Sequence, residues 1–157
     1  MTLEDFYFVS QIIAVFAIIG SLIFVGIQIR QNTRATRAAS HHAVSNSLND
    51  LNCMFAESGE VTRIWLAGQN DRQGLSPQDR WRFDSILRAY MHVCETMYMQ
   101  ADIGTGDESI VRAEENGIRE VLAHPGSREW WDENPFGFGT RFRDYVATLE
   151  KTTTVKS

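Results

Sequence analysis

The chain opens with a long uninterrupted apolar run and then changes to a mixed apolar and polar pattern. The run from Phe6 to Ile29, FYFVSQIIAVFAIIGSLIFVGIQI, contains no charged residue. At about 1.5 Å per residue, a helix of this length reaches roughly 36 Å, which is enough to cross a hydrocarbon layer of about 30 Å with some tilt. The pattern therefore predicts one transmembrane helix.

The charges that flank this run predict its orientation. Acidic Glu4 and Asp5 precede it, whereas Arg30, Arg34 and Arg37 follow it at the expected membrane surface. Because basic flanks stay on the cytoplasmic side, we expect the amino terminus to lie outside and the rest of the chain to be cytoplasmic. The sequence does not fit a cleaved signal peptide, since the residues before the run are acidic and no cleavage site with the small-x-small pattern follows it. The anchor is therefore expected to remain attached.

Small side chains recur along one face of the predicted span. Six residues follow one line of the helix at spacings of four, three, four, three and four: Ser10, Ala14, Ala17, Ser21, Phe24 and Gln28. Small side chains let helices approach closely in lipid, so this line is an expected helix–helix interface. The alternative is the lining of a homo-oligomeric pore, with Phe24 as an apolar constriction and Gln28 at the cytoplasmic mouth. Chance also produces such lines, because small residues are common in spans.

Beyond the run, the apolar spacing is that of amphipathic helices, and no segment has a strand pattern. Neither glycine nor proline occurs between Ile27 and Ser58, so the first helix is expected to continue past the membrane. Four apolar residues then share one helical face: Val44, Leu48, Leu51 and Phe55. Ser58 and Gly59 are expected to end or kink this helix.

The remaining segments predict a bundle of helices. Ser76, Pro77 and Asp79 combine a capping hydroxyl, a proline at the first helical position and an acid in the first turn, which is typical of a helix start. Other helices are expected at 60–66, 107–123, from Pro125 onward, and at 140–149 with Thr140 as its cap. The fold class is thus all-α, with anchor 1–29, juxtamembrane helix 30–58, helical cytoplasmic domain 59–150 and flexible tail 151–157.

Composition narrows the class of protein. The chain has 157 residues and a net charge of -5, so the roughly 128 residues after Ile29 suffice for one compact domain. Since the arginines gather beside the span, the domain beyond them is acidic, which disfavours nucleic acid as a partner. Cys53 and Cys94 are too few for a disulfide framework, and in a reducing compartment both are expected to be free thiols.

The sequence contains no convincing metal, cofactor or catalytic motif. His92 and Glu95 lie three apart, but a carboxylate-bridged di-iron site needs Glu-x-x-His on two helices, in the reverse order. With Arg88 they project opposite the apolar stripe of the helix that starts at Ser76, which indicates a solvated or interfacial charge cluster. That stripe consists of Phe83, Leu87, Tyr90, Cys94, Met97 and Ala101. His41 and His42 point about 100° apart on a helix and cannot bind one metal together. The sequence lacks the motifs G-x-x-x-x-G-K-[ST], G-x-S-x-G and H-E-x-x-H and the glycine fingerprint of dinucleotide-binding folds, so no cofactor is expected.

Adjacent tryptophans near the end of the chain are a candidate contact surface. Trp130 and Trp131 could dock a partner, because tryptophan is enriched among interface hot spots. Core packing is the competing interpretation for at least one of them. Adjacent residues on a helix diverge, so we do not expect both tryptophans to face one core directly.

Three segments carry a resemblance to a known group of proteins: IQIRQNTRATRAA after the span, LSPQDRWRFDSILRAY, and HPGSREWWDEN. Together they resemble an uncharacterised group of small bacterial single-pass membrane proteins with a helical cytoplasmic domain. The resemblance implies a bacterial inner-membrane setting and no activity.

The resulting hypothesis is a non-enzymatic inner-membrane protein that acts in assembly, either as a homo-oligomer or as an accessory subunit of a larger membrane complex. Its expected partners are membrane lipid and those protein subunits. A homo-oligomeric pore and a membrane-tethered enzyme stay open as alternatives.

Overall fold

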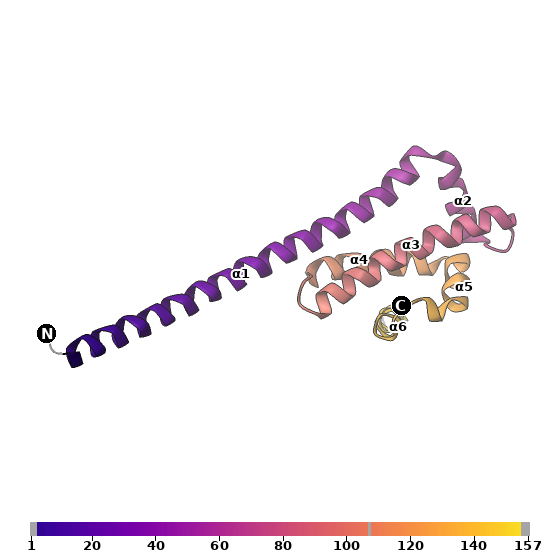
Figure 1. Cartoon of the computed structure of the whole chain (residues 1–157). Coiled ribbons are helices and arrows are strands. Elements are labelled where there is room, and N and C mark those ends of the chain that lie inside the picture. The colour runs from indigo at the N-terminus through magenta and orange to yellow at the C-terminus, as the bar shows by residue number, and fades with distance from the viewer. Residues whose placement is uncertain (1–2, 107, 155–157) are drawn as a thin grey trace. The chain divides into compact units, whose positions relative to one another are not determined.

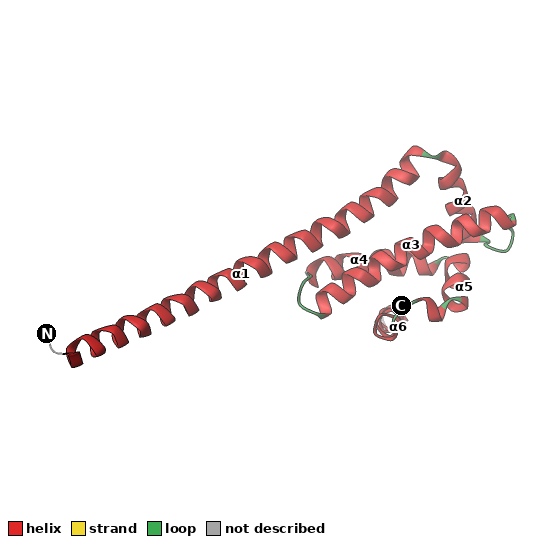
Figure 2. Ribbon diagram, viewed as in Figure 1, coloured by secondary structure: helices red, strands yellow, loops and turns green. Residues whose placement is uncertain are grey.

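The computed structural model describes residues 3–106 and 108–154, and every regular element among them is a helix (Figures 1 and 2). The elements are α1 (Leu3–Glu57), α2 (Gly59–Asn70), α3 (Pro77–Asp102), α4 (Glu108–Ala123), α5 (Pro125–Glu133), the 3₁₀ helix η1 (Pro135–Gly137) and α6 (Thr140–Thr154). The predicted all-α fold class is confirmed.

The chain forms two compact units, Met1–Ala38 and Ala39–Ser157. The first unit is the amino-terminal part of α1. The second contains the rest of α1 together with α2 to α6. The helix α1 passes residues 29 and 38 without a break, as the absence of glycine and proline after Ile27 predicted.

The corner between α1 and α2 lies at Ser58, where the backbone is extended with φ -127° and ψ 104°. The Ser58 hydroxyl accepts a hydrogen bond from the Val61 amide at 3.3 Å, which caps α2. The Thr62 hydroxyl donates to the carbonyl oxygen of Phe55 at 2.8 Å and so ties the two helices together. The expected kink at Ser58 and Gly59 is confirmed.

The helices α3 and α4 form an antiparallel hairpin and lie side by side (Figure 1). The predicted start of α3 is confirmed, because Ser76 Oγ accepts from the Asp79 amide at 3.1 Å and Pro77 is the first helical residue. At the other end, Gly104 has φ 74°, the left-handed conformation that glycine adopts without strain. The amides of Thr105 and Gly106 then close on the Gln100 carbonyl oxygen at 2.8 and 2.7 Å.

The core of the second unit joins residues from α1 to α6. Its most deeply buried large side chains are Ile64, Phe83, Leu87, Met91, Trp130, Phe142 and Val146. The predicted apolar face of α1 is used: Val44 is buried, Leu48 packs against the core, and the Phe55 ring lies 5.4 Å from that of Trp65. This face attaches the end of α1 to the bundle.

Two helix boundaries differ from the sequence pattern. The helix α2 continues to Asn70, beyond the end expected at residue 66, because Gly68 and Gln69 are buried by tertiary packing. Thr140 was expected to cap the last helix, and this is wrong. The Arg143 amide donates to the Gly139 carbonyl oxygen at 3.1 Å, so Gly139 is the capping residue and Thr140 is the first helical residue.

The carboxyl end of α6 also extends beyond the prediction. The helix was expected to end at Leu149, but it runs to Thr154. Part of the predicted flexible tail 151–157 is therefore helical, and residues 155–157 lie outside the described residues.

Candidate functional site

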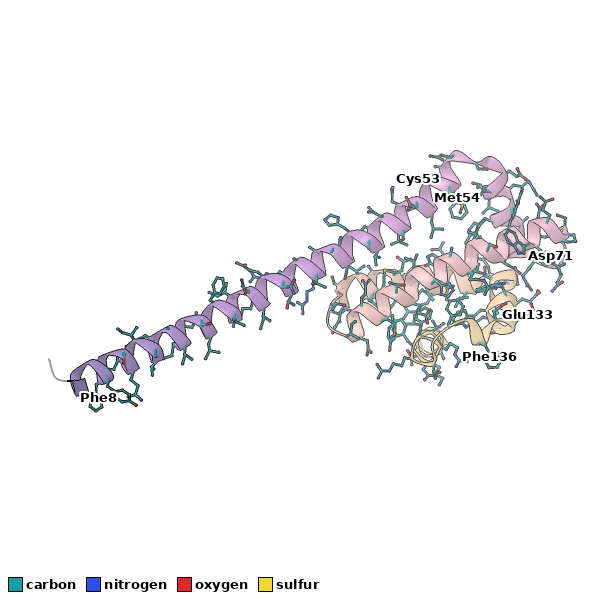
Figure 3. All side chains as sticks on the ribbon, viewed as in Figure 1. Phe8, Cys53, Met54, Asp71, Glu133 and Phe136 are labelled. Atoms are coloured by element: carbon teal, nitrogen blue, oxygen red, sulfur yellow. The ribbon has the colours of Figure 1, made fainter. Side chains whose placement is uncertain are left out.

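The first unit is an apolar helix whose described side chains are exposed throughout. The large apolar residues between Tyr7 and Ile29 have exposed fractions from 45% at Val25 to 70% at Phe16. Figure 3 shows such side chains, Phe8 among them, projecting from α1. Among the described residues α1 is the one helix long and apolar enough to cross a membrane, and none of its most apolar window is buried.

The predicted small-residue line lies on this exposed helix. All six of its members are exposed: Ser10, Ala14, Ala17, Ser21, Phe24 and Gln28. The Ser10 hydroxyl donates to the Tyr7 carbonyl oxygen at 2.8 Å, so this polar group is satisfied within the helix. The interface or pore-lining role of the line stays a prediction.

The predicted membrane-surface flank continues the same exposed helix. Arg30, Arg34 and Arg37 are exposed along α1 in the first unit. Nearby hydroxyls bond back to the helix: Thr33 Oγ1 donates to the Ile29 carbonyl oxygen at 2.9 Å. The polar groups that follow the apolar segment are thus compatible with an uninterrupted helix.

The structure buries both tryptophans, which favours core packing over the candidate docking role. Trp130 is 0% exposed and Trp131 is 9% exposed. Phe138 contacts both rings, with centroid distances of 6.1 Å to Trp130 and 5.0 Å to Trp131. The turn after α5 folds back over the helix, so two diverging side chains enter one core.

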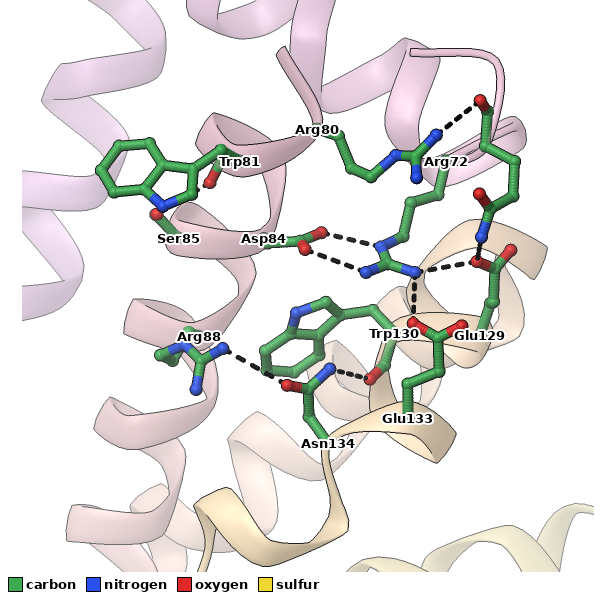
Figure 4. Close-up of polar contacts among 11 residues, drawn as sticks. Arg72, Arg80, Trp81, Asp84, Ser85, Arg88, Glu129, Trp130, Glu133 and Asn134 are labelled. Carbon is green, nitrogen blue, oxygen red and sulfur yellow. Dashed lines mark hydrogen bonds and ion pairs between the residues drawn. The ribbon is translucent and has the colours of Figure 1, made fainter. Parts of the chain in front are cut away.

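A buried arginine links three elements at one end of the second unit (Figure 4). Arg72, in the loop after α2, is 7% exposed. Its Nε and Nη2 donate to the two oxygens of Asp84 on α3 at 2.8 and 2.9 Å. Its Nη1 donates to Glu129 and Glu133 on α5 at 2.8 and 2.6 Å. This guanidinium connects the α2–α3 loop to both helices.

Three carboxylates converge on this one cation, which keeps it charged. The hydrogen bond with Asp84, followed by those with Glu133 and Glu129, raises the pKa of Arg72 above its ordinary value against the opposing effect of burial. Among residues 3–106 and 108–154, no group of three His, Cys, Asp or Glu side chains is arranged to hold a metal ion. At the convergence of Asp84, Glu129 and Glu133, the guanidinium occupies the centre. We interpret the cluster as a structural clamp.

The sequence pattern did not reveal this clamp. The local sequence predicts a polar loop at residues 68–75, and no neighbouring residue indicates that Arg72 is buried. One weak signal was available: Glu129 and Glu133 are four residues apart on a short helix and therefore share a face. Such a pair of like charges is destabilising unless a cation lies between them.

A second polar contact joins Arg88 to the same helix. The Arg88 guanidinium lies 5.4 Å from the centroid of the Trp130 ring, within the range of a cation–π interaction. It also donates to Asn134 Oδ1 at 3.3 Å. Arg88 is therefore exposed, as the sequence indicated, and its guanidinium covers one side of the buried tryptophan.

The pair His92 and Glu95 is only partly solvated. His92 is 48% exposed and its Nδ1 lies 3.2 Å from Glu95 Oε2, but the Glu95 side chain is only 19% exposed. Glu95 Oε1 accepts a hydrogen bond from the Gly139 amide at 2.6 Å. Of the two alternatives, Glu95 is interfacial, because its carboxylate binds the amino-terminal end of α6, whereas His92 is solvent-exposed.

The two cysteines are free thiols in different surroundings, as predicted for their redox state. Cys53 is exposed on α1, whereas Cys94 is buried on α3. Burial, followed by the nearby charge of Glu114, raises the pKa of the Cys94 thiol to about 12. This thiol is therefore protonated at neutral pH and is a packing group.

Comparison with known proteins assigns neither a family nor a function to the chain. No protein-family model matches the chain. No curated protein and no solved structure matches it either.

Proposed function

We propose that this chain is a single-pass membrane protein whose helical second unit serves assembly, either with further copies or as an accessory subunit of a larger membrane complex. The exposed apolar surface of α1 between Tyr7 and Ile29 carries this proposal. Covering a large apolar side chain stabilises by about 1.5–3 kcal/mol, so the whole segment amounts to tens of kcal/mol. Lipid, or helices packed within lipid, supplies such cover.

The proposed setting is the bacterial inner membrane, with the amino terminus outside and the second unit in the cytoplasm. Arg30, Arg34 and Arg37 support this orientation, because basic residues beside a span are retained on the cytoplasmic side. The resemblance to small bacterial single-pass proteins supports the choice of membrane.

Assembly is the proposed role because the span carries a line of small residues. Ser10, Ala14, Ala17 and Ser21 leave one side of α1 with little side-chain bulk, and helices in lipid associate through such close-packed surfaces. A span that only anchored the domain would need apolar residues but no such line.

The membrane proposal is tested by extraction of the full chain from cells. We expect the protein to stay in the membrane fraction after alkaline carbonate treatment. The double variant Phe16→Arg with Ile19→Arg should move it to the soluble or aggregated fraction, because an arginine at the centre of a span costs about 2.5–3.5 kcal/mol. The matched control is Ala35→Arg with Ala38→Arg, outside the apolar run, which should leave the distribution unchanged.

Orientation is tested separately with reporters. A reporter that is active only in the cytoplasm, fused after Ser157, should be active, and one that is active only outside should be silent there. Release of the unmodified chain by carbonate contradicts the span. Outside activity at Ser157 with retention in the membrane contradicts only the orientation.

A further inference from the structure

A groove in the second unit lies between the end of α1 and the α3–α4 hairpin. Its volume is about 350 Å³. Its apolar walls come from four helices, and the residues are Leu48, Leu51, Phe55, Trp65, Ile86 and Val121. The lining positions cover 48–55 on α1 and 114–121 on α4, which corresponds to roughly 10 Å along each helix. The groove is therefore short and mostly apolar.

A fixed tyrosine–carboxylate pair lines the groove. Tyr90 on α3 donates its hydroxyl hydrogen to Glu114 Oε1 on α4 at 2.7 Å. Burial, more than the neighbouring charges, raises the pKa of Tyr90 above its ordinary value, so the hydroxyl stays a donor at neutral pH. A Cβ at Gly117 would lie 2.8 Å from the Tyr90 hydroxyl oxygen. This close approach explains a glycine in the middle of α4, where it costs up to about 1 kcal/mol of helix stability.

The groove carries two carboxylates without a counter-ion. Glu114 and Glu120 both line it, and no described cation forms an ion pair with either of them. Glu115, next to Glu114 on the same helix, contrasts with them because it pairs with Arg119 at 3.4 Å. A carboxylate beside apolar walls is costly to desolvate unless a cation pairs with it. The charge that would complement this groove is therefore positive.

We propose that the groove binds a small organic cation with an apolar body. Its ammonium group would pair with the half-buried Glu114, with the exposed Glu120 adding negative charge at the rim. Its body would lie against Leu51, Phe55 and Trp65. The volume lies near the lower end of the range for small-molecule sites, about 300–1,000 Å³. A protein partner would bury about 800 Å² on each side, which a groove of roughly 10 Å does not provide. The proposal does not depend on the membrane role.

The test uses the full chain in lipid nanodiscs and three probes with the same apolar body. The probes are 4-phenylbutylammonium, 4-phenylbutanol and 4-phenylbutyrate, which share a phenyl group on a four-carbon chain and end in a cationic, a neutral and an anionic group. Binding is followed by NMR of labelled methyl groups at Leu48, Leu51 and Val121, with the methyl groups between Ile12 and Ile29 as a monitor of partition into lipid. We expect saturable shifts at the groove, with the ammonium probe at least tenfold tighter than the alcohol and the carboxylate weakest.

Charge recognition is tested with Glu114→Gln, which keeps an acceptor for the Tyr90 hydroxyl. We expect this variant to lose at least tenfold in affinity for the ammonium probe and to change affinity for the alcohol less than twofold, which also reports that the groove has folded. Glu108→Gln, on the same helix and outside the groove, should bind as the parent does. Equal affinity for the three probes, an unaffected Glu114→Gln variant, or shifts confined to the span would each overturn the proposal.

Discussion

Gly126 on α5 lies against the carbonyl oxygen of Gly68 on α2, so close that a Cβ at Gly126 would be 1.9 Å from that oxygen. On its other side, a Cβ at Gly68 would lie 2.4 Å from Cδ2 of Phe83 on α3. The helix α2 is thus held between α5 and α3 at two positions that admit no side chain. This close approach also brings Arg72, just after α2, to the carboxylates of α5.

We predict that Gly126→Ala strongly destabilises the second unit. The added methyl meets a backbone oxygen, which cannot rotate away, so α5 must move from α2 at a cost of about 3 kcal/mol or more. Urea unfolding measures this loss, and tryptophan fluorescence reports it because all four tryptophans lie in the second unit. The control is Gly59→Ala, where a Cβ meets nothing within 4 Å and stability should hold or rise slightly. Similar losses for the two variants would contradict the close approach.

Replacement of Arg72 with methionine should cost about 3–5 kcal/mol, because it leaves three carboxylates together without their shared cation. Arg63→Met is the matched control: its guanidinium, 57% exposed, pairs with Asp79 at 3.1 Å, and such exposed pairs contribute less than about 1 kcal/mol. Urea unfolding at pH 7 compares the two variants. A loss at Arg72 no larger than that at Arg63 would show that the clamp is unimportant.

Glu95→Ala should lower the free energy of unfolding by about 1–2 kcal/mol, since the Gly139 amide loses its acceptor at the start of α6. Glu95→Gln should recover part of this loss, because its amide oxygen can still accept. Hydrogen exchange of the Gly139 amide gives a direct readout and should accelerate in the alanine variant only. If both variants exchange at the parent rate, the contact between Glu95 and α6 has no energetic role.

The buried, protonated thiol of Cys94 should make the second unit less stable at alkaline pH. Its thiol has an ordinary pKa of 9.0, raised to about 12 in the fold, so the unfolded chain releases this proton first as the pH rises. The contribution is fully present below pH 9 and is lost between pH 9 and 12, with on the order of 1 kcal/mol lost by pH 10. Cys94→Ala should be less stable than the parent at pH 8 and should show a flatter decline to pH 10. Parallel declines would contradict the burial of a protonated thiol.

Bulky substitutions on the small-residue line should impair assembly without impairing insertion into the membrane. Ala17→Leu and Ser21→Leu should insert normally, because leucine enters lipid readily, but their added bulk should hold neighbouring helices apart. Native mass spectrometry of the detergent-extracted protein should therefore show smaller species for both. Ile18→Leu, on another face, should retain the parent stoichiometry. One stoichiometry for all three variants would mean that assembly uses a different surface.

Local sequence features predicted the helices well where their determinants lie within one or two turns. Ser76 and Pro77 start α3, and Gly104 and Gly106 form the turn that ends it. Both features are local, because capping and a left-handed turn depend on neighbouring residues. The boundaries failed where distant contacts decide. The helix α2 continues through Gly68 because α3 and α5 bury it, and α6 is capped at Gly139 with help from Glu95, which is 44 residues away in the sequence.

The sequence by itself determined the long apolar helix, the all-α class and the apolar faces of α1 and α3, since composition and helical spacing are properties of contiguous residues. Only the tertiary structure decided that Trp131 is buried beside Trp130, that Arg72 reaches Glu133 across 61 residues, and that a groove lies beside Tyr90 and Glu114. These features depend on which helix faces meet and how closely. That choice is made by side-chain packing between segments far apart in the chain, which no local pattern records.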